Sequence, residues 1–243
     1  MNMCINDMMG ELGNKSNPMN IIMIDGKEIK MKIFYDVDTQ NDFMNKDGAL
    51  YVPDAESIKD NLAKLADYAE ENDIRILGSI DRHFKGDAEL SANGGPFPNH
   101  CMDGEDGMKK ILQTMPVRRV KYIQNPQSPE GPFLTDIGVQ ETIEDYPVII
   151  FEKQHYDVST NPEFEKIVKA LNPEEMMVIM YGVATDYCVY AAAKAFSDLG
   201  AKVVIVKDAI KGVDLEDSSA KIDELVDKYK VELTTTEGIT GAK

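Results

Sequence analysis

The feature that most constrains this chain is a repeated alternation of short apolar runs with segments of helical pattern. The apolar, β-prone runs cover residues 33–37, 74–80, 148–152, 176–182, 202–207 and 231–235. The run at 176–182 has no polar alternation, as expected of a parallel strand covered on both faces. Alternation of this kind is typical of helices packed on a parallel sheet. We therefore predict an α/β fold, a three-layer α/β/α sandwich with a mainly parallel central sheet.

The segments between the runs carry helix signals. The first has one apolar face, formed by Ile58, Leu62, Leu65 and Ala69. Asp54 precedes it and is predicted to be its N-cap. Asn161 followed by Pro162 predicts the start of another helix. Further helices are expected at about 186–199, ended by Gly200, and near 217–229.

Residues 84–147 interrupt this alternation and are irregular and rich in glycine and proline. We predict a loop insertion there, with a hairpin around residues 117–123 and 132–139. No internal repeat or linker marks a domain boundary. The prediction is a single domain over residues 31–243, preceded by a poorly specified extension over residues 1–30.

Charge and cysteine content exclude several classes of partner. The formal net charge is −17, which argues against nucleic acid and anionic membranes, because phosphate binding needs a basic surface. No apolar run approaches the roughly 20 residues of a membrane-spanning helix. The three cysteines are widely spaced, which argues against a disulfide framework and indicates a reducing cytoplasm.

Residues able to do chemistry follow four of the predicted strands. They are Asp38, Asp81, Lys153 and, in the turn GVATDYC, Cys188. Asp, Gly and Lys commonly end strands, so each one alone is a weak signal. In open parallel sheets, however, ligands bind at the carboxyl ends of the strands. Convergence of all four on one edge indicates a catalytic site.

Cys188 is predicted to lie in the first turn of a helix, where free N–H groups and the helix dipole stabilise a thiolate or an oxyanion. Lys153 would lower the pKa of the thiol, and Asp38 would accept its proton and return it to a leaving amine. A cysteine among apolar helical residues also commonly fills a core, and Val189 and Ala191 fit that alternative.

Two of the three histidines, His83 and His100, lie close to Asp81 in the sequence. Imidazole and carboxylate together suit zinc, iron or manganese. Asp87 or Glu89 would complete the ligand set. The alternative is that both histidines lie on the surface of a long loop.

Five sequence blocks, in order, resemble those of the nicotinamidase/isochorismatase-like cysteine hydrolases. They are DTQNDF (38–43), SIDRHF (79–84), GGPFPNHC (94–101), FEKQ (151–154) and GVATDYCV (182–189). The resemblance covers roughly residues 31–235. It implies the fold predicted above and a catalytic triad of Asp38, Lys153 and Cys188. It also implies a cis peptide between Val183 and Ala184, with the N–H groups of Ala184 and Cys188 forming the oxyanion hole.

The resemblance further implies three metal ligands, Asp81, His83 and His100. The histidine pair favours the nicotinamidase branch over isochorismatases and carbamoyl-amide hydrolases, which generally lack it. Phe43 and Phe97 match aromatic positions that enclose the substrate ring, although many nicotinamidases have Trp at the second. Tyr187 stands where a His is frequent. The family's additional ligand has no obvious match, so Asp87 and Glu89 both stay open.

We therefore expect a metal-assisted cysteine amidohydrolase that converts nicotinamide to nicotinate and ammonia. One alternative is a related hydrolase of another small amide or a carbamoyl amide. Another, of a different class, is a non-catalytic binding protein on the same fold. Members of this family often form homo-oligomers, so the resemblance also implies a homo-oligomer for this chain.

Overall fold

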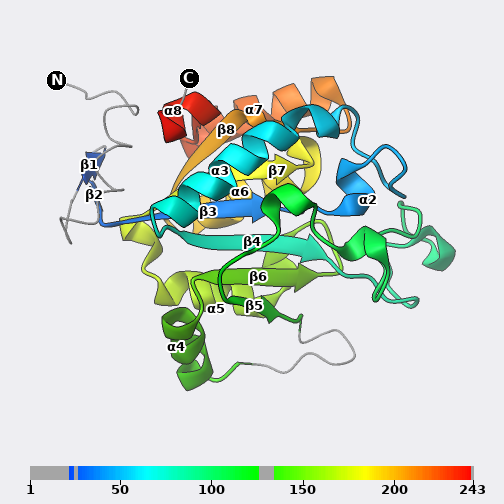
Figure 1. Ribbon diagram of the computed structural model, residues 1–243, viewed down its shortest axis with the longest axis horizontal. Coiled ribbons are helices and arrows are strands. Elements are labelled where there is room, and N and C mark those ends of the chain that lie inside the picture. Colours follow the sequence, from blue (N-terminus) through cyan, green and yellow to red (C-terminus); the bar gives the residue numbers. More distant parts are fainter. Residues whose placement is uncertain (1–21, 25–26, 126–133, 242–243) are drawn as a thin grey trace.

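A seven-stranded sheet, in which every strand pair is parallel, runs through the protein in the order β5-β6-β4-β3-β7-β8-β9 (Figure 1). The computed structural model describes residues 22–24, 27–125 and 134–241. The strands of the sheet are β3 (Met31–Val37), β4 (Arg75–Asp81), β5 (Val120–Ile123), β6 (Val148–Lys153), β7 (Met176–Val183), β8 (Lys202–Lys211) and β9 (Glu232–Thr234). The predicted parallel sheet is confirmed.

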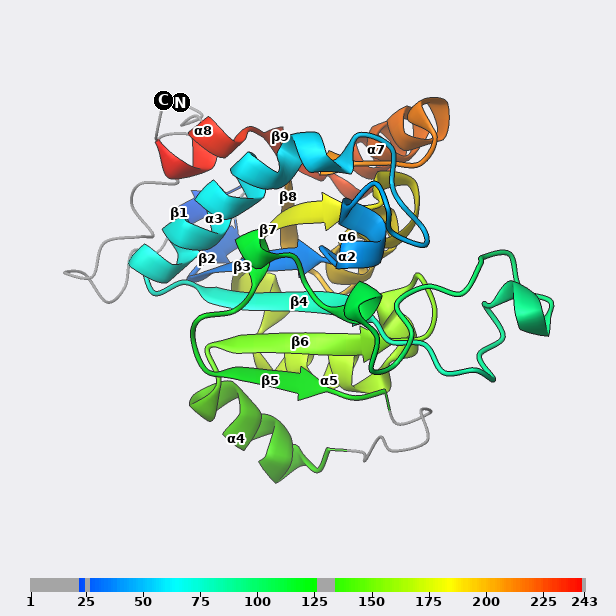
Figure 2. The same cartoon turned by 45° about the vertical axis from the view of Figure 1, so that its right-hand side comes forward.

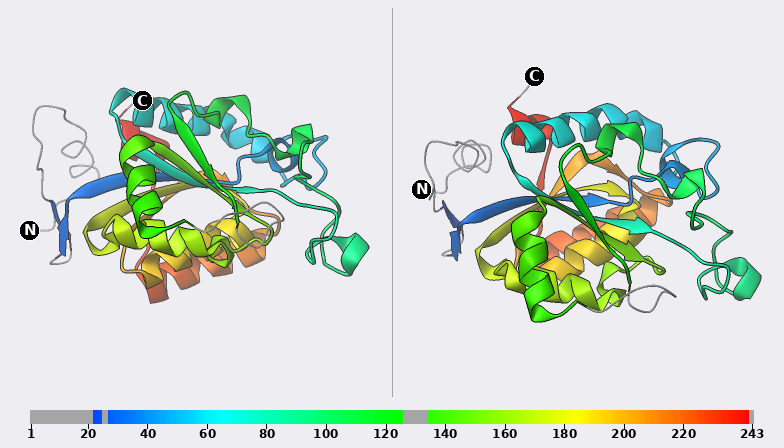
Figure 3. Two further views of the ribbon diagram at one scale, coloured as in Figure 1. Left: turned by 90° about the horizontal axis from the view of Figure 1, so that it is seen from below. Right: turned by 60° about the horizontal axis from the view of Figure 1, so that its bottom comes forward.

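Helices cover both faces of this sheet (Figure 3). On one face lie α3 (Lys59–Glu71) and α8 (Thr236–Thr240). The other face is covered by α4 (Asp136–Asp145), α5 (Pro162–Ala170), α6 (Tyr190–Asp198) and α7 (Leu215–Tyr229). A short helix, α2 (Asn41–Met44), lies beyond the end of β3. Two separate apolar clusters fill the spaces between sheet and helices, so the predicted three-layer sandwich is confirmed.

The inner strand β7, which lies next to the central strand β3, is buried along its whole length, because its side chains alternate between the two apolar clusters. Ile179 belongs to the cluster under α3, whereas Val178 belongs to the cluster under α5 and α6. In the second cluster Tyr35 meets Phe196 edge to face, with ring centroids 4.9 Å apart. Such pairs add about 0.5–1.5 kcal/mol to the burial of the rings themselves.

Helix signals in the sequence are mostly confirmed. The side chain of Asn161 caps α5 by accepting a hydrogen bond from the backbone N–H of Glu163. Gly200, with φ of 98°, follows the end of α6. The Asp54 prediction is wrong in detail. Asp54 precedes a 3-10 turn (Ala55–Ile58), makes no side-chain cap hydrogen bond, and pairs with Lys211. The apolar face predicted for the following helix is buried.

The hairpin predicted in the glycine-rich segment is wrong. Residues 120–123 form β5, an edge strand parallel to β6, and residues 136–145 form α4. Residues 126–133 lie outside the described part of the chain, as does most of the predicted N-terminal extension, although β1 (Ile22–Ile24) and β2 (Lys27–Ile29) pair antiparallel within it. None of the described helices has the length and apolar character needed to cross a membrane.

Lys32, on β3, is only 6% exposed, and its ammonium lies 5.6 Å from the ring centroid of Tyr68. Burial lowers the pKa of Lys32 from 10.5 to about 8. Between about pH 8 and pH 10.5, the unfolded chain therefore binds more protons at this group than the folded chain. Stability from this group therefore rises as the pH increases from about 8 to 10.5.

Replacing Lys32 by methionine removes the cost of burying this charge. We expect Lys32→Met to be more stable than the wild type by about 1–3 kcal/mol at pH 7, with the difference shrinking as the pH approaches 10.5. Urea unfolding of both proteins at pH 7 and pH 10 measures this. A stability difference that does not change with pH would show that Lys32 is not the titrating group.

Candidate active site

The carboxyl ends of four adjacent strands, β6, β4, β3 and β7, bring the predicted catalytic residues together. The arrows of β3, β4, β6 and β7 point towards the same end of the sheet (Figures 1 and 2). Asp81 and Lys153 end β4 and β6 as register partners. Asp38 directly follows β3, with φ of 46°, and Cys188 lies in the turn after β7.

The Lys153 ammonium lies at the centre of this group and is completely buried. Its Nζ is 2.9 Å from Oδ2 of Asp38 and 3.7 Å from Sγ of Cys188. It also donates a short hydrogen bond to Oδ1 of Asp81. One cation therefore contacts the nucleophile candidate and both carboxylates, so the three side chains predicted to act together do meet.

Burial dominates the titration behaviour of the site. It raises the pKa of the Cys188 thiol well above its usual value, and Lys153 only partly opposes this. Burial also raises the pKa of Asp38. Burial acts in the same direction on Asp81, but the charge of Lys153 and the two nearby histidines outweigh it and hold the pKa of Asp81 well below its usual range. Asp81 is therefore ionised, whereas Asp38 is the carboxyl group better suited to carry a proton.

This differs from the expectation of a resting thiolate. The helix start and Lys153 do favour the anion, but Cys188 is 8% exposed and faces two carboxyl groups as well as one cation. The loss of hydration therefore outweighs the attraction of the ammonium. Burial therefore favours the thiol form of the resting sulfur, and the Asp38 carboxyl group lies nearby to accept its proton.

The turn that carries Cys188 has an unusual backbone. The peptide bond between Val183 and Ala184 is cis, and residues Thr185–Val189 form a π-helical turn that continues into α6. Gly182 has φ of 119°, and a Cβ atom there would lie 2.1 Å from the carbonyl oxygen of Val37. Only glycine fits this position, where β7 passes close to β3.

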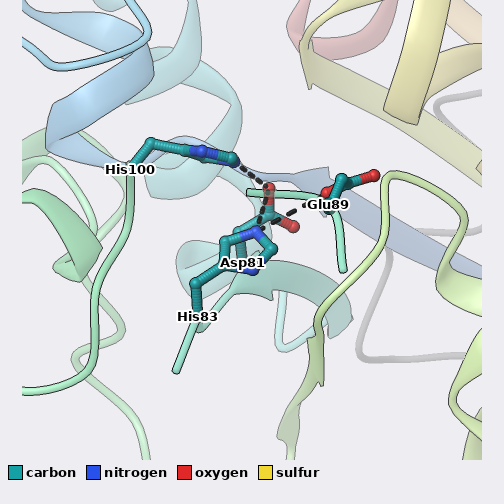
Figure 4. A group of neighbouring side chains, drawn as sticks. All are labelled: Asp81, His83, Glu89 and His100. Carbon is teal, nitrogen blue, oxygen red and sulfur yellow. Dashed lines mark ion pairs between the residues drawn. The ribbon is translucent and has the colours of Figure 1, made fainter. Parts of the chain in front are cut away.

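Four buried side chains that suit a metal ion gather beside the triad (Figure 4). They are Asp81, His83, Glu89 and His100, and their donor atoms all lie within 4.8 Å of one another. Of the two residues left open by the sequence, Glu89 joins this group. Asp87 instead lies behind His83, with Oδ2 3.1 Å from Nδ1 of the ring.

The donor set fits a divalent cation on two grounds. The Nδ1 atom of each histidine faces an outer oxygen, on Asp87 for His83 and on Pro98 for His100, which turns each Nε2 towards the group. Outer partners of this kind are typical of metal-bound histidines. Nε2 of His83 is buried without a hydrogen-bond partner.

The second ground is charge. Three buried carboxyl groups, those of Asp38, Asp81 and Glu89, lie within this site, and Lys153 balances one negative charge. Buried charges require compensation, and a divalent cation would supply the remainder.

A pocket with a volume of about 90 Å³ opens onto the sulfur and the metal donors. This is small beside the roughly 300–1,000 Å³ of pockets for drug-sized ligands, so it suits a small substrate. All three aromatic residues expected at the substrate line it, namely Phe43, Phe97 and Tyr187. Tyr187 and Phe97 meet edge to face at 5.8 Å.

Several lining residues were not found from the sequence, namely Leu50, Val52, Tyr156 and Val213. All four lie in loops that follow the carboxyl ends of β3, β6 and β8. That position was the signal available, but apolar residues in loops carry no pattern of their own. Glu89 also holds this lining in place, because its Oε1 accepts a hydrogen bond from the backbone N–H of Tyr156 at 3.0 Å.

Comparison with known proteins agrees with this geometry. A family model described as the isochorismatase domain matches residues 36–238. The nicotinamidase of Saccharomyces cerevisiae is 24% identical over 227 residues, covering 84% of this chain and 95% of that relative.

Two crystal structures share the fold. The pyrazinamidase of Pyrococcus horikoshii in complex with zinc matches with a TM-score of 0.64 at 23% identity, covering 84% of this chain and 98% of its own. The N-carbamoylsarcosine amidase of Thermoplasma acidophilum matches with a TM-score of 0.61 at 18% identity, covering 85% and 97%.

The family match and the curated relatives define an amidohydrolase, and the fold is a three-layer α/β/α sandwich. The family model spans most of the chain, and the protein therefore belongs to the isochorismatase family, where its relatives include nicotinamidases.

The donor group predicts that the purified protein binds a divalent metal through His100. We expect His100→Ala to weaken metal binding by at least about 10-fold, because one of four donors is lost. Metal content after dialysis against a weak chelator measures this. The matched control is Asp106→Ala, because Asp106 is exposed, pairs with Lys109 and lies outside the donor group. Equal metal content in the His100 variant and the wild type would contradict the assignment.

Proposed function

We propose that this protein hydrolyses nicotinamide to nicotinate and ammonia. The observation that carries this proposal is the position of Cys188, at one pocket with Asp38 and Lys153 beside it and four metal donors adjoining it. The pocket is small and lined mainly by apolar and aromatic side chains, which suits a single uncharged ring. The nicotinamidase relatives support this substrate.

In the first half-reaction, the sulfur of Cys188 attacks the amide carbon while Asp38 accepts the thiol proton. The N–H groups of Ala184 and Cys188 stabilise the negative oxygen of the tetrahedral intermediate. Asp38 then gives the proton to the amide nitrogen, the carbon–nitrogen bond breaks, and ammonia leaves. The acyl group remains on Cys188 as a thioester.

In the second half-reaction, water attacks the thioester carbon and Asp38 accepts a proton from it. The carbon–sulfur bond breaks, Asp38 returns its proton to the sulfur of Cys188, and the carboxylic acid leaves and loses its proton to solvent. Throughout both halves, the ammonium of Lys153 orients Asp38 and balances its charge, at 2.9 Å from its Oδ2.

The residues that would hold the divalent metal are Asp81, His83, Glu89 and His100. When bound, the ion would act as a Lewis acid that holds the pyridine nitrogen and water. The ion would be zinc, iron or manganese, which all accept this mixture of imidazole and carboxylate donors. The zinc complex of the Pyrococcus horikoshii pyrazinamidase supports zinc among these.

We place this reaction in NAD salvage in a reducing cytoplasm. We further propose that residues 31–243 act as one hydrolase domain, that residues 1–30 are an extension to it, and that copies associate as a homo-oligomer.

Removal of the nucleophile tests the mechanism. We expect Cys188→Ala to lower the rate of ammonia release from nicotinamide by at least about 10³-fold with the fold intact, because no thioester can form. Ammonia release measures activity, and thermal unfolding monitors the fold. The matched control is Cys101→Ala, which removes the other described cysteine, also buried and free.

Two results would overturn this proposal. Turnover retained by the Cys188 variant would exclude thioester chemistry. The second result is wild-type protein that releases no ammonia from nicotinamide, with or without added metal, but hydrolyses a carbamoyl amide. This result would assign the site to the carbamoyl-amide hydrolases of the family.

A further inference from the structure

The segment between β8 and α7, residues 212–214, has no part in the chemistry above, yet it reaches the pocket. Val213 lines the pocket and is 48% exposed, so it forms part of the wall where the pocket meets solvent. No helix or strand contains this residue. Its position therefore depends on whatever holds the loop.

Asp186 holds this loop. Its side chain is buried, with the residue only 5% exposed, and both of its oxygens are used. Oδ1 accepts a hydrogen bond from the N–H of Val213 at 3.0 Å, and Oδ2 accepts one from the N–H of Asp214 at 2.8 Å. Hydrogen bonds to an ionised acceptor are about twice as strong as neutral ones. Moving Val213 outwards would leave a buried carboxylate without these donors.

Two further contacts limit the movement of the loop. A Cβ atom on Gly212 would lie 3.0 Å from Oδ1 of Asp186 and 1.9 Å from Oγ of Ser218, so the backbone packs closely against both. Lys211 at the other end pairs with Asp54 at 2.5 Å. Asp54 lies two residues after Val52, which lines the same pocket.

Asp186 also lies two residues before Cys188 in the π-helical turn. One carboxylate therefore joins the turn that carries the nucleophile to the loop that carries part of the pocket wall. The distance between sulfur and wall is thus set by a rigid connection rather than by a free loop.

We propose that Asp186 and Val213 together form a size-selecting wall, in which Val213 limits how large a substituent can approach Cys188 and Asp186 is the positioning residue that holds it. If the proposed function holds, the site accepts the unsubstituted ring of nicotinamide and rejects rings with an added group facing Val213. This consequence for substrates rests on the proposed function. The wall itself is a property of the pocket and holds for any small amide.

Alkylation of Cys188 tests the wall without relying on the substrate. Wild type, Val213→Ala, Asp186→Asn and Asp214→Ala are treated with iodoacetamide and with the bulkier N-benzyl iodoacetamide. Modification of the peptide containing Cys188 is followed by mass spectrometry. The readout is the ratio of the bulky to the small reagent rate, and thermal unfolding of each variant checks that Cys188 reacts from the folded state.

We expect this ratio to rise about tenfold in Val213→Ala, because the space of a few carbon atoms in an apolar pocket changes discrimination by at least that much. Asp186→Asn should raise it similarly, since an amide nitrogen would face one of the two N–H groups. Asp214→Ala is the matched control. It removes the side chain that caps α7 through Asp217, but leaves the backbone N–H that Asp186 binds, so its ratio should equal that of the wild type.

An unchanged ratio in Val213→Ala would contradict the proposal that Val213 limits access to Cys188. A rise in that variant but not in Asp186→Asn would overturn the positioning role of Asp186. A second assay measures ammonia release from nicotinamide by the wild type, which the proposed function predicts. If nicotinamide is not hydrolysed while the alkylation ratios shift as expected, the proposed substrate is wrong and the wall stands.

Discussion

The site depends on one buried cation. Lys153 is completely buried, and an unpaired ammonium in such a place would lose its proton or unfold the protein. Burial does lower its pKa, but Asp38 and Asp81 outweigh this and keep it charged. The pairing in turn requires that β6, β4 and β3 lie side by side with their ends level, which the parallel register of Asp81 with Lys153 provides. The strand order and register therefore determine whether Lys153 can stay charged in the site.

Asp38 and Asp81 share this cation, yet their pKa values shift in opposite directions. Asp81 faces Nε2 of His100 at 3.4 Å and Nε2 of His83 at 3.8 Å, and it stays ionised, as a metal ligand must. Asp38 lacks those neighbours, is fully buried, and is the carboxyl group better able to exchange a proton with sulfur and nitrogen. Glu89 extends the same principle outwards, because one of its oxygens faces His83 and the other fixes the backbone of Tyr156 in the pocket wall. Metal binding and pocket shape therefore share a residue.

The sequence was most informative where burial leaves a periodic or unbroken apolar pattern. β7 is buried on both faces, so seven of its eight residues stand out as an apolar run, and the polar residues that end its neighbours could be assigned to one edge. β5 is different. It lies at the edge of the sheet and only Ile123 of its four residues is fully buried, so its pattern was mistaken for half of a hairpin. The choice between Asp87 and Glu89 was likewise out of reach, because it depends on backbone pairing of Glu89 with Phe97 across the loop.

The loops after the strands carry the rest of the site, and their positions follow from tertiary contacts that no local pattern encodes. Val213 shows this clearly. It is an exposed apolar residue beside a glycine, a combination that by itself indicates only a loop. It enters the pocket because a buried carboxylate 27 positions earlier binds its N–H. The turn after β7 consequently has two roles, since it presents Cys188 to the substrate and, through Asp186, fixes a wall opposite it. A change in this turn is therefore expected to alter reactivity and selectivity together, whereas a change at Val213 separates them.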